Sequence, residues 1–188
     1  MIRVFYGMSG AFKGTTIQHF KNLDPGSKVL SSKNKLWKGF ESNLFPGMIE
    51  KSHLNLALLH LCNLSTIDGS FAGNILIERG VTDPIFYQVM DCPNLLRNPS
   101  WIEKAVQEEL KLLPEEPKKI LLIQKDRDFI ENTVLSEPTR REIFENADIY
   151  LEKQDLYVNF TKRFNKISEI VEIDCAAKFL EELDKKNY

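Results

Sequence analysis

Five short apolar runs spread along the chain constrain its fold more than any other feature. They cover residues 2–6, 28–31, 74–78, 119–124 and 169–174. Three of them are almost continuously apolar, which is typical of strands covered on both faces of a sheet. The second run is weak, and its assignment depends mostly on the runs around it. Together the runs predict an α/β fold with a sheet of about five strands.

The segments between these runs are long enough for helices. We expect helices over residues 15–23, 46–61, 83–90, 99–113 and 176–183, and one long helix or two shorter helices over 140–167. Alternation of strands and helices predicts a parallel sheet with helices on both faces. Ligands of such folds bind beyond the carboxyl ends of the strands, so residues just after the first, third and fourth strands are the candidate site. No repeat or linker divides the chain, and residues 1–188 are predicted to form a single domain.

Composition narrows the class of protein. With 188 residues, 43% hydrophobic, and a net charge of −2, the chain suits one ordinary domain and gives no general reason to expect a polynucleotide partner. No apolar run reaches 18 residues and the apolar start is too short for a signal peptide, which predicts a cytoplasmic protein without a membrane partner. Cys62, Cys92 and Cys175 lack metal-binding spacing and are predicted to be buried thiols.

The first strand leads into the stretch GMSGAFKGTT, residues 7–16, which has the frame of a phosphate-binding loop, G-x-x-x-x-G-K-[ST]. Backbone N–H groups of such a loop hold phosphates, and Lys13 would reach the outer ones. Phe12 replaces the second glycine, so it either adopts a negative φ or is strained by about 1–3 kcal/mol. The alternative is a tight turn that binds nothing. The residues predicted to hold the nucleotide are Gly7, Ser9, Gly10, Ala11, Phe12, Lys13, Gly14, Thr15 and Thr16.

The third strand ends in Glu78 and Arg79, beside the predicted loop. An acid at this place can hold the magnesium shell of a bound nucleotide. An arginine beside it can bind a substrate phosphate or hydroxyl group. Asp83 is either a helix cap or a further substrate contact. The alternative is an ordinary charged strand end, but the two motifs occur together at plausible spacing.

The run Lys13-Gly14-Thr15 is similar to the loop of adenylate kinases. Together with Glu78-Arg79-Gly80, it makes the chain resemble the deoxynucleoside kinase and thymidylate kinase group of P-loop NTPases, whose third strand ends in E-R-S or D-R. The resemblance implies a three-layer P-loop fold with a helical lid over about residues 127–141. It also implies ATP and Mg²⁺ as cofactors, with the metal near Thr15 and Glu78.

The resemblance covers most of the chain, but one family residue is missing. In SSKNKLWKG, residues 31–39, Trp37 matches the family's aromatic position, whereas Ser32 replaces the glutamate that serves as general base. A monophosphate acceptor is already anionic and needs cations such as Lys33 rather than a base. We therefore predict transfer from ATP to a deoxynucleoside monophosphate. The alternatives are a deoxynucleoside kinase, and a non-catalytic nucleotide-binding or protein-binding module in which Phe12 blocks the loop.

The remaining candidate residues follow from the same resemblance. Arg127, Arg140 and Arg141 match lid arginines loosely, and Tyr150 and Tyr157 match a tyrosine pattern on the following helix. The alternative for the two adjacent arginines is the start of a helix. The predicted catalytic residues are Lys13, Glu78, Arg79, Arg140 and Arg141. The predicted substrate-binding residues are Lys33, Trp37, Phe45, Asn55, Arg79 and Asp83. A homodimer is expected from the resemblance alone.

Overall fold

A computed structural model describes residues 1–31, 53–67, 69, 71 and 73–185. Its strands are β1 (Ile2–Tyr6), β2 (Lys28–Ser31), β3 (Ile75–Glu78), β4 (Lys118–Gln124) and β5 (Glu169–Ile173). All pairs are parallel, in the order β2-β3-β1-β4-β5. The prediction of a parallel sheet of about five strands is confirmed.

Strand β1 lies at the centre of the sheet, where Phe5 aligns with Glu78 of β3 and Ile120 of β4. Because parallel strands share a direction, the residues that follow β1, β3 and β4 emerge at one edge of the sheet. Gly7 follows β1 and Arg79 follows β3 at this edge. The two sequence motifs are thus adjacent.

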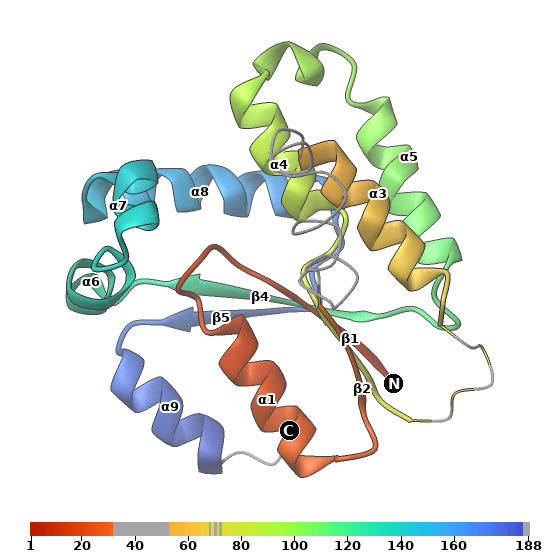
Figure 1. Ribbon diagram of the computed structural model, residues 1–188, viewed down its shortest axis with the longest axis horizontal. Coiled ribbons are helices and arrows are strands. Elements are labelled where there is room, and N and C mark those ends of the chain that lie inside the picture. Colours follow the sequence, from red (N-terminus) through yellow and green to blue (C-terminus); the bar gives the residue numbers. More distant parts are fainter. Residues whose placement is uncertain (32–52, 68, 70, 72, 186–188) are drawn as a thin grey trace, which may run out of the picture.

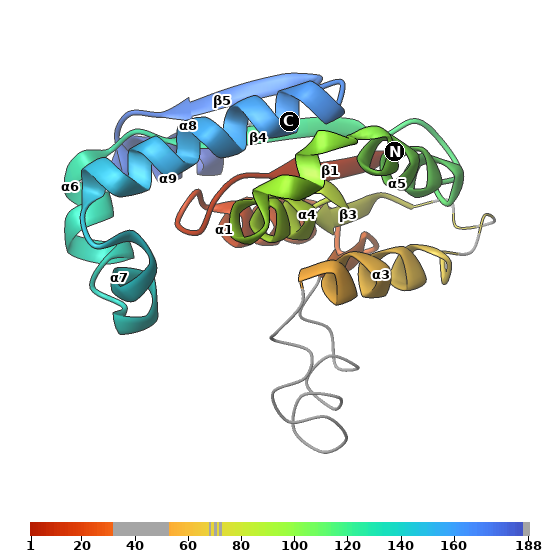
Figure 2. The same ribbon diagram turned by 90° about the horizontal axis from the view of Figure 1, so that it is seen from above.

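Helices cover both faces of the sheet (Figure 1). Helices α1 (Lys13–Leu23) and α9 (Ala176–Lys185) lie on one face. Helices α3 (His53–Leu64), α4 (Thr82–Asp91), α5 (Ser100–Lys111) and α8 (Ala147–Phe164) lie on the other. Shorter segments are the 3₁₀-helix η1 (Pro93–Arg97), α6 (Arg127–Phe129), the π-helical η2 (Ile130–Val134) and α7 (Pro138–Phe144). The view from above shows α7 beyond the end of α8, on the side of the sheet where β4 ends (Figure 2).

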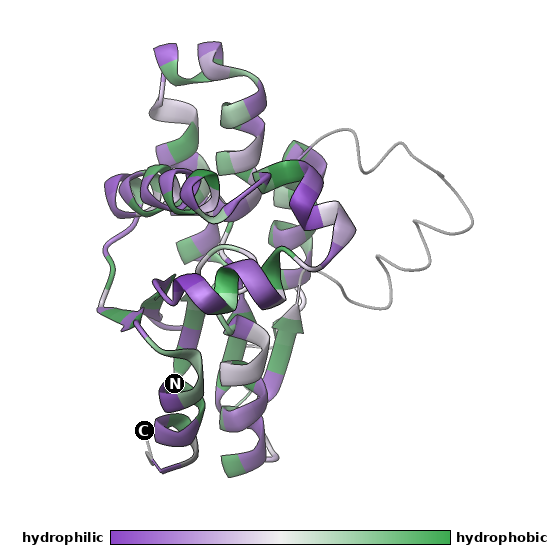
Figure 3. Ribbon diagram, turned by 90° about the vertical axis from the view of Figure 1, so that its left-hand side faces the viewer, coloured by the Kyte–Doolittle hydropathy of each residue, from purple (hydrophilic) through white to green (hydrophobic). Residues whose placement is uncertain are grey.

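Alternating side chains of the central strands feed two separate hydrophobic clusters. Val4 and Tyr6 of β1 point into the larger cluster with α4 and α8, whereas Phe5 points into the smaller one with α1 and α9. This alternation follows from the two-residue period of a strand. Hydrophobic residues accordingly run along the strands, whereas the helices mix hydrophobic and hydrophilic residues (Figure 3).

Residues 140–167 form two helices rather than one. Helix α7 ends at Phe144, Glu145 has a positive φ of 56°, and Asn146 caps α8 by accepting a hydrogen bond from the Ile149 N–H at 3.0 Å. An asparagine cap after a residue with positive φ starts a new helix in a new direction. Arg140 and Arg141 therefore lie on α7, and Tyr150 and Tyr157 both lie on α8.

Two further predictions, the burial of the cysteines and the bounds of the helix over residues 46–61, differ from the structure. The three cysteines are exposed, so the prediction of buried thiols is wrong: in each case the side chain is on the outside of the layers described above. The predicted helix over 46–61 is described only from His53, and it continues to Leu64. Among the described residues, no helix is long and apolar enough to cross a membrane.

Candidate functional site

The loop between β1 and α1 depends on two glycines. Gly7 has φ of 148° and Gly10 has φ of 89°, a region that side chains rarely adopt. A Cβ on Gly7 would lie 2.7 Å from the Leu122 carbonyl oxygen, and one on Gly10 would lie 2.4 Å from a Val134 methyl group. These close approaches to β4 and η2 require glycine at both positions.

Phe12 keeps the left-handed backbone of the glycine that it replaces, with φ of 56° and ψ of 20°. Its ring lies 4.8 Å from that of Phe129 on α6 and 5.6 Å from that of Phe179 on α9. A left-handed non-glycine residue is strained by about 1–2 kcal/mol. Aromatic contacts of about 0.5–1.5 kcal/mol per pair offset this strain. Of the two possibilities set out from the sequence, the strained conformation is the one present.

Replacing Phe12 by glycine and by alanine separates strain from packing. Both changes remove the ring, but only glycine relieves the left-handed strain. We therefore expect Phe12→Gly to be more stable than Phe12→Ala by about 1 kcal/mol. Urea unfolding of the two variants measures this difference, and equal or reversed stabilities would contradict a left-handed Phe12.

Lys13 is buried at the start of α1, and its ammonium group holds the loop. Nζ donates hydrogen bonds to the carbonyl oxygens of Gly7 at 2.5 Å and Met8 at 2.9 Å. Burial, together with the positive charge of Arg79, lowers the pKa of Lys13 to about 7. An anion beside this lysine would restore its charge.

The N-terminus of α1 opens onto free space. Among the described residues, no atom lies within 4 Å of the place that a Cβ on Gly14 would take. Within the described part of the chain, the amides of Lys13, Gly14 and Thr15 donate no hydrogen bond, as expected of a first helical turn. Unpaired N–H groups and the helix dipole favour an anion at this place. The Thr16 hydroxyl donates to the Phe12 carbonyl at 2.9 Å and is buried, so Thr15 is the hydroxyl that faces the opening.

A cavity of about 880 Å³ lies over this helix terminus. The loop, the end of β3, and residues of α3, α4, α6, α7 and α8 line it. Its lining includes four cations and two carboxylates, namely Lys13, Arg79, Arg140, Lys153, Glu78 and Asp91. One part of the wall is apolar or aromatic and comes from α3 and α4: Leu56, Pro84, Phe86, Tyr87 and Met90. The cavity thus combines an anion site with a surface suited to a flat ring.

Arg79 follows β3 in a left-handed conformation with φ of 72°. Its Nη1 lies 3.5 Å from Oδ2 of Asp83, a fully buried carboxylate. Burial opposes the charge of Arg79, but the negative groups around it, with Asp83 the strongest of them, together raise the pKa of Arg79 above its ordinary value. Glu78 accepts a hydrogen bond from the Ser31 hydroxyl at 2.7 Å. Both strand-end residues are therefore held in fixed positions.

The cavity brings together most of the residues predicted from the two motifs. They are Ser9, Gly10, Ala11, Phe12, Lys13, Gly14, Thr15, Glu78, Arg79 and Arg140. Gly7 and Thr16 do not line the cavity. Each makes a hydrogen bond at one end of the loop, Gly7 to the Tyr157 hydroxyl and Thr16 to the Phe12 carbonyl. Lys33, Trp37 and Phe45, as well as Ser32, lie outside the described residues.

Four predicted positions need correction. Asp83 does not line the cavity; it is buried behind Arg79 as its partner. Arg141 and Asn55 are exposed and lie outside the cavity lining, because each is on the outer side of its helix. Arg127 is exposed and pairs with Asp148 at 2.8 Å. Arg140 is the one lid arginine of the three that lines the cavity.

Two residues that line the cavity, Lys153 and His60, were not among the predicted site residues. Lys153 lies on α8 between Tyr150 and Tyr157, and its helical spacing from both is the only signal of its position. His60 also lines the cavity, and its Nε2 lies 2.7 Å from Oε1 of the buried Glu109. No local pattern joins these two residues, because 49 positions separate them.

A magnesium ion fits this site only together with a ligand. The described residues contain no group of three or more metal-binding side chains. Mg²⁺ usually keeps several waters and binds one or two carboxylates together with substrate phosphates. Glu78 and Thr15 both line the cavity and provide oxygen donors of the type that Mg²⁺ prefers. The donor set therefore fits a metal bound to a nucleotide.

A parallel sheet of order β2-β3-β1-β4-β5, with a glycine loop and a buried lysine between β1 and α1, defines the P-loop NTPase fold. Comparison with family models gave no match, and comparison with curated protein sequences gave none. Solved structures do match. A deoxyadenosine kinase from M. mycoides with the products dCMP and a flexible dCDP bound has a TM-score of 0.60 and 16% identity, over 97% of this chain and 95% of that chain.

Two further structures are similar to nearly the same extent. A thymidylate kinase from Ehrlichia chaffeensis has a TM-score of 0.58 and 14% identity, over 98% of this chain and 97% of that chain. The M. mycoides deoxyadenosine kinase with bound dCTP has a TM-score of 0.57 and 18% identity, over 97% and 96%. The chain therefore has the fold of the deoxynucleoside and nucleotide kinases among P-loop NTPases.

Proposed function

We propose that the protein transfers the γ-phosphoryl group of ATP to a deoxynucleoside monophosphate. The observation that carries this proposal is the cavity, in which the glycine loop after β1 and four cations meet an aromatic and apolar wall. Phosphoryl transfer consists mostly of positioning and of neutralising charge, and such a lining suits both tasks. The wall between α3 and α4 suits the base of an acceptor nucleotide, since aromatic faces stack on nucleobases.

Each lining cation has a role in this proposal. Lys13 and the first amides of α1 hold the donor phosphates. Arg79, fixed by Asp83, holds the acceptor phosphate, and Arg140 with Lys153 neutralises charge on the transferred group. Glu78 and Thr15 would hold a Mg²⁺ ion together with the nucleotide phosphates, and the ion would supply further charge neutralisation. Binding two phosphate-bearing ligands accounts for the excess of positive charge in the cavity.

A deoxynucleoside kinase is the second candidate, because two of the similar structures are of a deoxyadenosine kinase. A nucleoside acceptor must lose the proton of its 5′-hydroxyl, and a carboxylate base assists that step. Among the described lining residues, Glu78 and Asp91 are the carboxylates. Oδ2 of Asp91 lies 3.6 Å from Nε2 of His53. The excess of cations favours the monophosphate.

The deciding experiment is transfer from γ-labelled ATP with Mg²⁺ to a panel of nucleosides, nucleoside monophosphates and a short oligonucleotide. We expect labelling of one deoxynucleoside monophosphate. Labelling of nucleosides alone would establish the second candidate instead. No labelling and no ATP binding would refute both and leave a non-catalytic module.

Gly14→Ala is a sharp probe in the same assay. The added methyl group meets no atom of the described part of the chain, and alanine favours a helix over glycine by about 1 kcal/mol. We therefore expect an equally or more stable protein with weaker ATP binding, because the methyl group occupies the space of the phosphates. Unchanged ATP affinity would place the phosphates elsewhere.

The lowered pKa of Lys13 predicts a pH-dependent affinity for ATP. Above about pH 7 the free protein has a neutral Lys13, whereas bound polyphosphate favours the ammonium form, so binding takes up a proton. ATP affinity should fall by up to about tenfold per pH unit above pH 7. Calorimetric titration in buffers of different ionisation enthalpy measures the uptake. A Lys13→Met variant should lack it, and uptake that persists in this variant would assign it to another group.

The lowered pKa of Lys13 also makes the free energy of unfolding depend on pH, in the direction opposite to that of ATP affinity. The unfolded chain has a Lys13 pKa near 10.5, so it binds more protons than the folded protein between about pH 7 and 10.5. The contribution of Lys13 to stability therefore increases with pH across this window. Rising pH above about 7 therefore weakens polyphosphate binding by Lys13 but increases its contribution to stability. Such opposite trends are expected of a residue that serves binding rather than folding.

A further inference from the structure

The hydroxyl group of Tyr157 lies at a junction between the two motifs. Its oxygen accepts a hydrogen bond from the Gly7 N–H at 3.0 Å, across 150 positions of sequence. The same hydroxyl donates its proton to Oδ1 of Asp83. Tyr157 is 1% exposed and Asp83 is 0% exposed, so water does not compete for either contact. One buried hydroxyl therefore joins the loop after β1 to the first turn of α4.

These contacts extend to Lys13 and Arg79, two of the four cations that line the cavity. The Gly7 carbonyl accepts a hydrogen bond from Lys13 Nζ at 2.5 Å, and Asp83 Oδ2 lies 3.5 Å from Arg79 Nη1. A continuous series of polar contacts thus runs from Lys13 through Gly7, Tyr157 and Asp83 to Arg79. Among the described residues, Asp83 Oδ2 makes no hydrogen bond, so Arg79 is the group that balances its charge.

The direction of the central hydrogen bond is fixed. Burial and the negative charge of Asp83 both raise the pKa of Tyr157, which keeps its hydroxyl protonated. Burial also raises the pKa of Asp83, but the positive charges of Arg79 and Lys13 oppose this rise. A protonated phenol has one proton to donate, and it is directed to the carboxylate. Its oxygen is then free to accept from the Gly7 amide.

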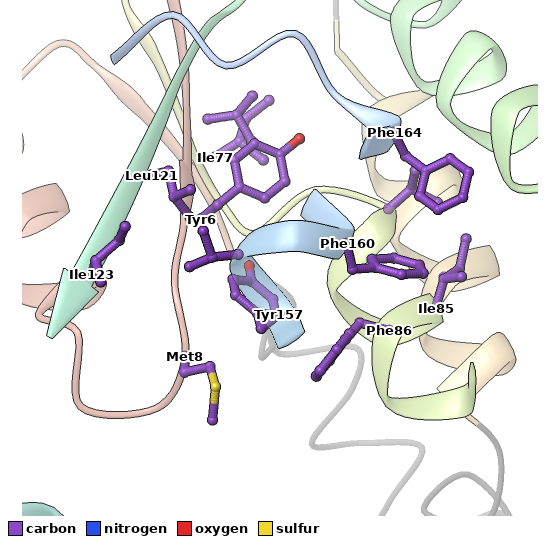
Figure 4. Packing of buried hydrophobic residues seen from close by; sticks show 14 of the residues in the cluster. Tyr6, Met8, Ile77, Ile85, Phe86, Leu121, Ile123, Tyr157, Phe160 and Phe164 are labelled. Atoms are coloured by element: carbon purple, nitrogen blue, oxygen red, sulfur yellow. The ribbon is translucent and has the colours of Figure 1, made fainter. Parts of the chain in front are cut away.

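Packing fixes the ring as firmly as the hydrogen bonds fix its hydroxyl. The Tyr157 ring makes an edge-to-face contact with Phe86 of α4 at 5.2 Å and 90°. Figure 4 shows the ring on the side of α8 that faces β1 and α4, near Met8 and Phe86. Because Met8 and Phe86 belong to the same buried cluster as Tyr157, packing holds the ring in place on α8 and thereby sets the position of its hydroxyl.

We infer that Tyr157 is a positioning residue that sets the placement of Lys13 relative to Arg79. This inference rests on the proposed function, in which Lys13 holds the donor phosphates and Arg79 holds the acceptor phosphate. Transfer requires both phosphates at a fixed separation, and a displacement of about 1 Å at such a site lowers rates by up to about 100-fold. Helix α8 thereby acts on the chemistry through Tyr157, which does not itself line the cavity.

Tyr157→Phe tests the inference, with Tyr150→Phe as the matched control. The Tyr150 hydroxyl, also on α8, donates to the Ser9 carbonyl of the same loop at 2.7 Å, but Tyr150 makes no contact with Asp83. We expect Tyr157→Phe to lower kcat for transfer from ATP to the monophosphate by about 10–100-fold and to raise KM for both substrates. Tyr150→Phe should raise KM for ATP alone. Equal effects of the two variants on both substrates would overturn the inference.

A double-mutant cycle distinguishes positioning from general damage. If Tyr157 acts through Asp83, the variant with both Tyr157→Phe and Asp83→Asn should have a kcat close to that of the more impaired single variant. Independent fold-changes that multiply would overturn the inference. The pair of Tyr157→Phe and a surface change, Lys162→Met, should multiply and serves as the reference.

Unfolding in urea separates this inference from the proposed function. Tyr157→Phe and Arg79→Met should be non-additive in the urea midpoint, because both act on the buried Asp83 carboxylate. A wild-type protein without transferase activity would refute the proposed function. Non-additive midpoints would then still support the link between Tyr157 and Arg79, and additive midpoints would overturn it.

Discussion

Lys13→Met is expected to lower kcat/KM for phosphoryl transfer by about 10²–10³-fold, which is the usual effect of removing one preorganised charged donor. The ammonium group is the cation nearest to the loop carbonyls and to the N-terminus of α1. Methionine has a similar length and suits the buried site, since burial already disfavours the charge. We therefore expect folding to persist.

Steady-state kinetics and circular dichroism of the Lys13→Met variant measure the two effects separately. Lys162→Met makes the same substitution at an exposed residue of α8 outside the cavity lining and is the control. The control should leave kcat/KM unchanged. Equal losses in both variants would show that net charge, rather than the loop, drives binding, and an active Lys13→Met variant would exclude the proposed donor site.

Arg79→Met is expected to have the second-largest effect, a loss of about 100-fold in kcat/KM together with lower stability. Removing the guanidinium group leaves the fully buried Asp83 carboxylate without its cation. A buried, unpaired polar group destabilises by about 1–3 kcal/mol. Both activity and folding should therefore respond to this one substitution.

The stability loss of Arg79→Met should depend on pH. Burial raises the pKa of Asp83, and removing the positive charge of Arg79 raises it further. The folded variant then retains a proton that the unfolded chain releases, so its stability falls as pH rises through this range. Urea unfolding should show a larger deficit at pH 8 than at pH 5. Arg97→Met, an exposed change on η1, should show no such trend.

Adding Asp83→Asn to Arg79→Met separates the two effects. The amide removes the buried charge, so stability should recover in part while activity stays low. Recovery of activity would place the function of Arg79 in folding rather than in substrate binding. Failure to recover stability would show that Asp83 is not the source of the deficit.

Much of the fold followed from local sequence patterns. All five strands agree with the apolar runs within one residue at each end. The three inner strands, β1, β3 and β4, are almost continuously apolar because both faces of the sheet are covered there. The loop was also predictable, since Gly7 and Gly10 mark backbone conformations that other residues avoid. Glu78 and Arg79 were placed correctly because parallel strands end at a common edge. Gly14 and Thr15 were predicted as the last part of the same loop motif, and both line the cavity.

The wrong predictions share one cause. A sequence pattern does not show which face of a helix points toward the cavity. Arg140 lines the cavity and Arg141 does not, since adjacent helical residues point about 100° apart. Asp83 was expected at the substrate, but the first turn of α4 directs it inward to Tyr157. The exposure of the three cysteines depended on the same orientation of helices and loops.

The sequence by itself determined the parallel sheet, the glycine loop after β1 and the strand end that bears Glu78 and Arg79, because these depend on contacts and conformations within a few residues. Only the tertiary structure decided that Phe12 is held by Phe129 and Phe179, that Lys153 reaches the cavity, and that Tyr157 joins Gly7 to Asp83. Such contacts join residues far apart in the chain. They exist only after helices pack on the sheet and bring their side chains within bonding distance.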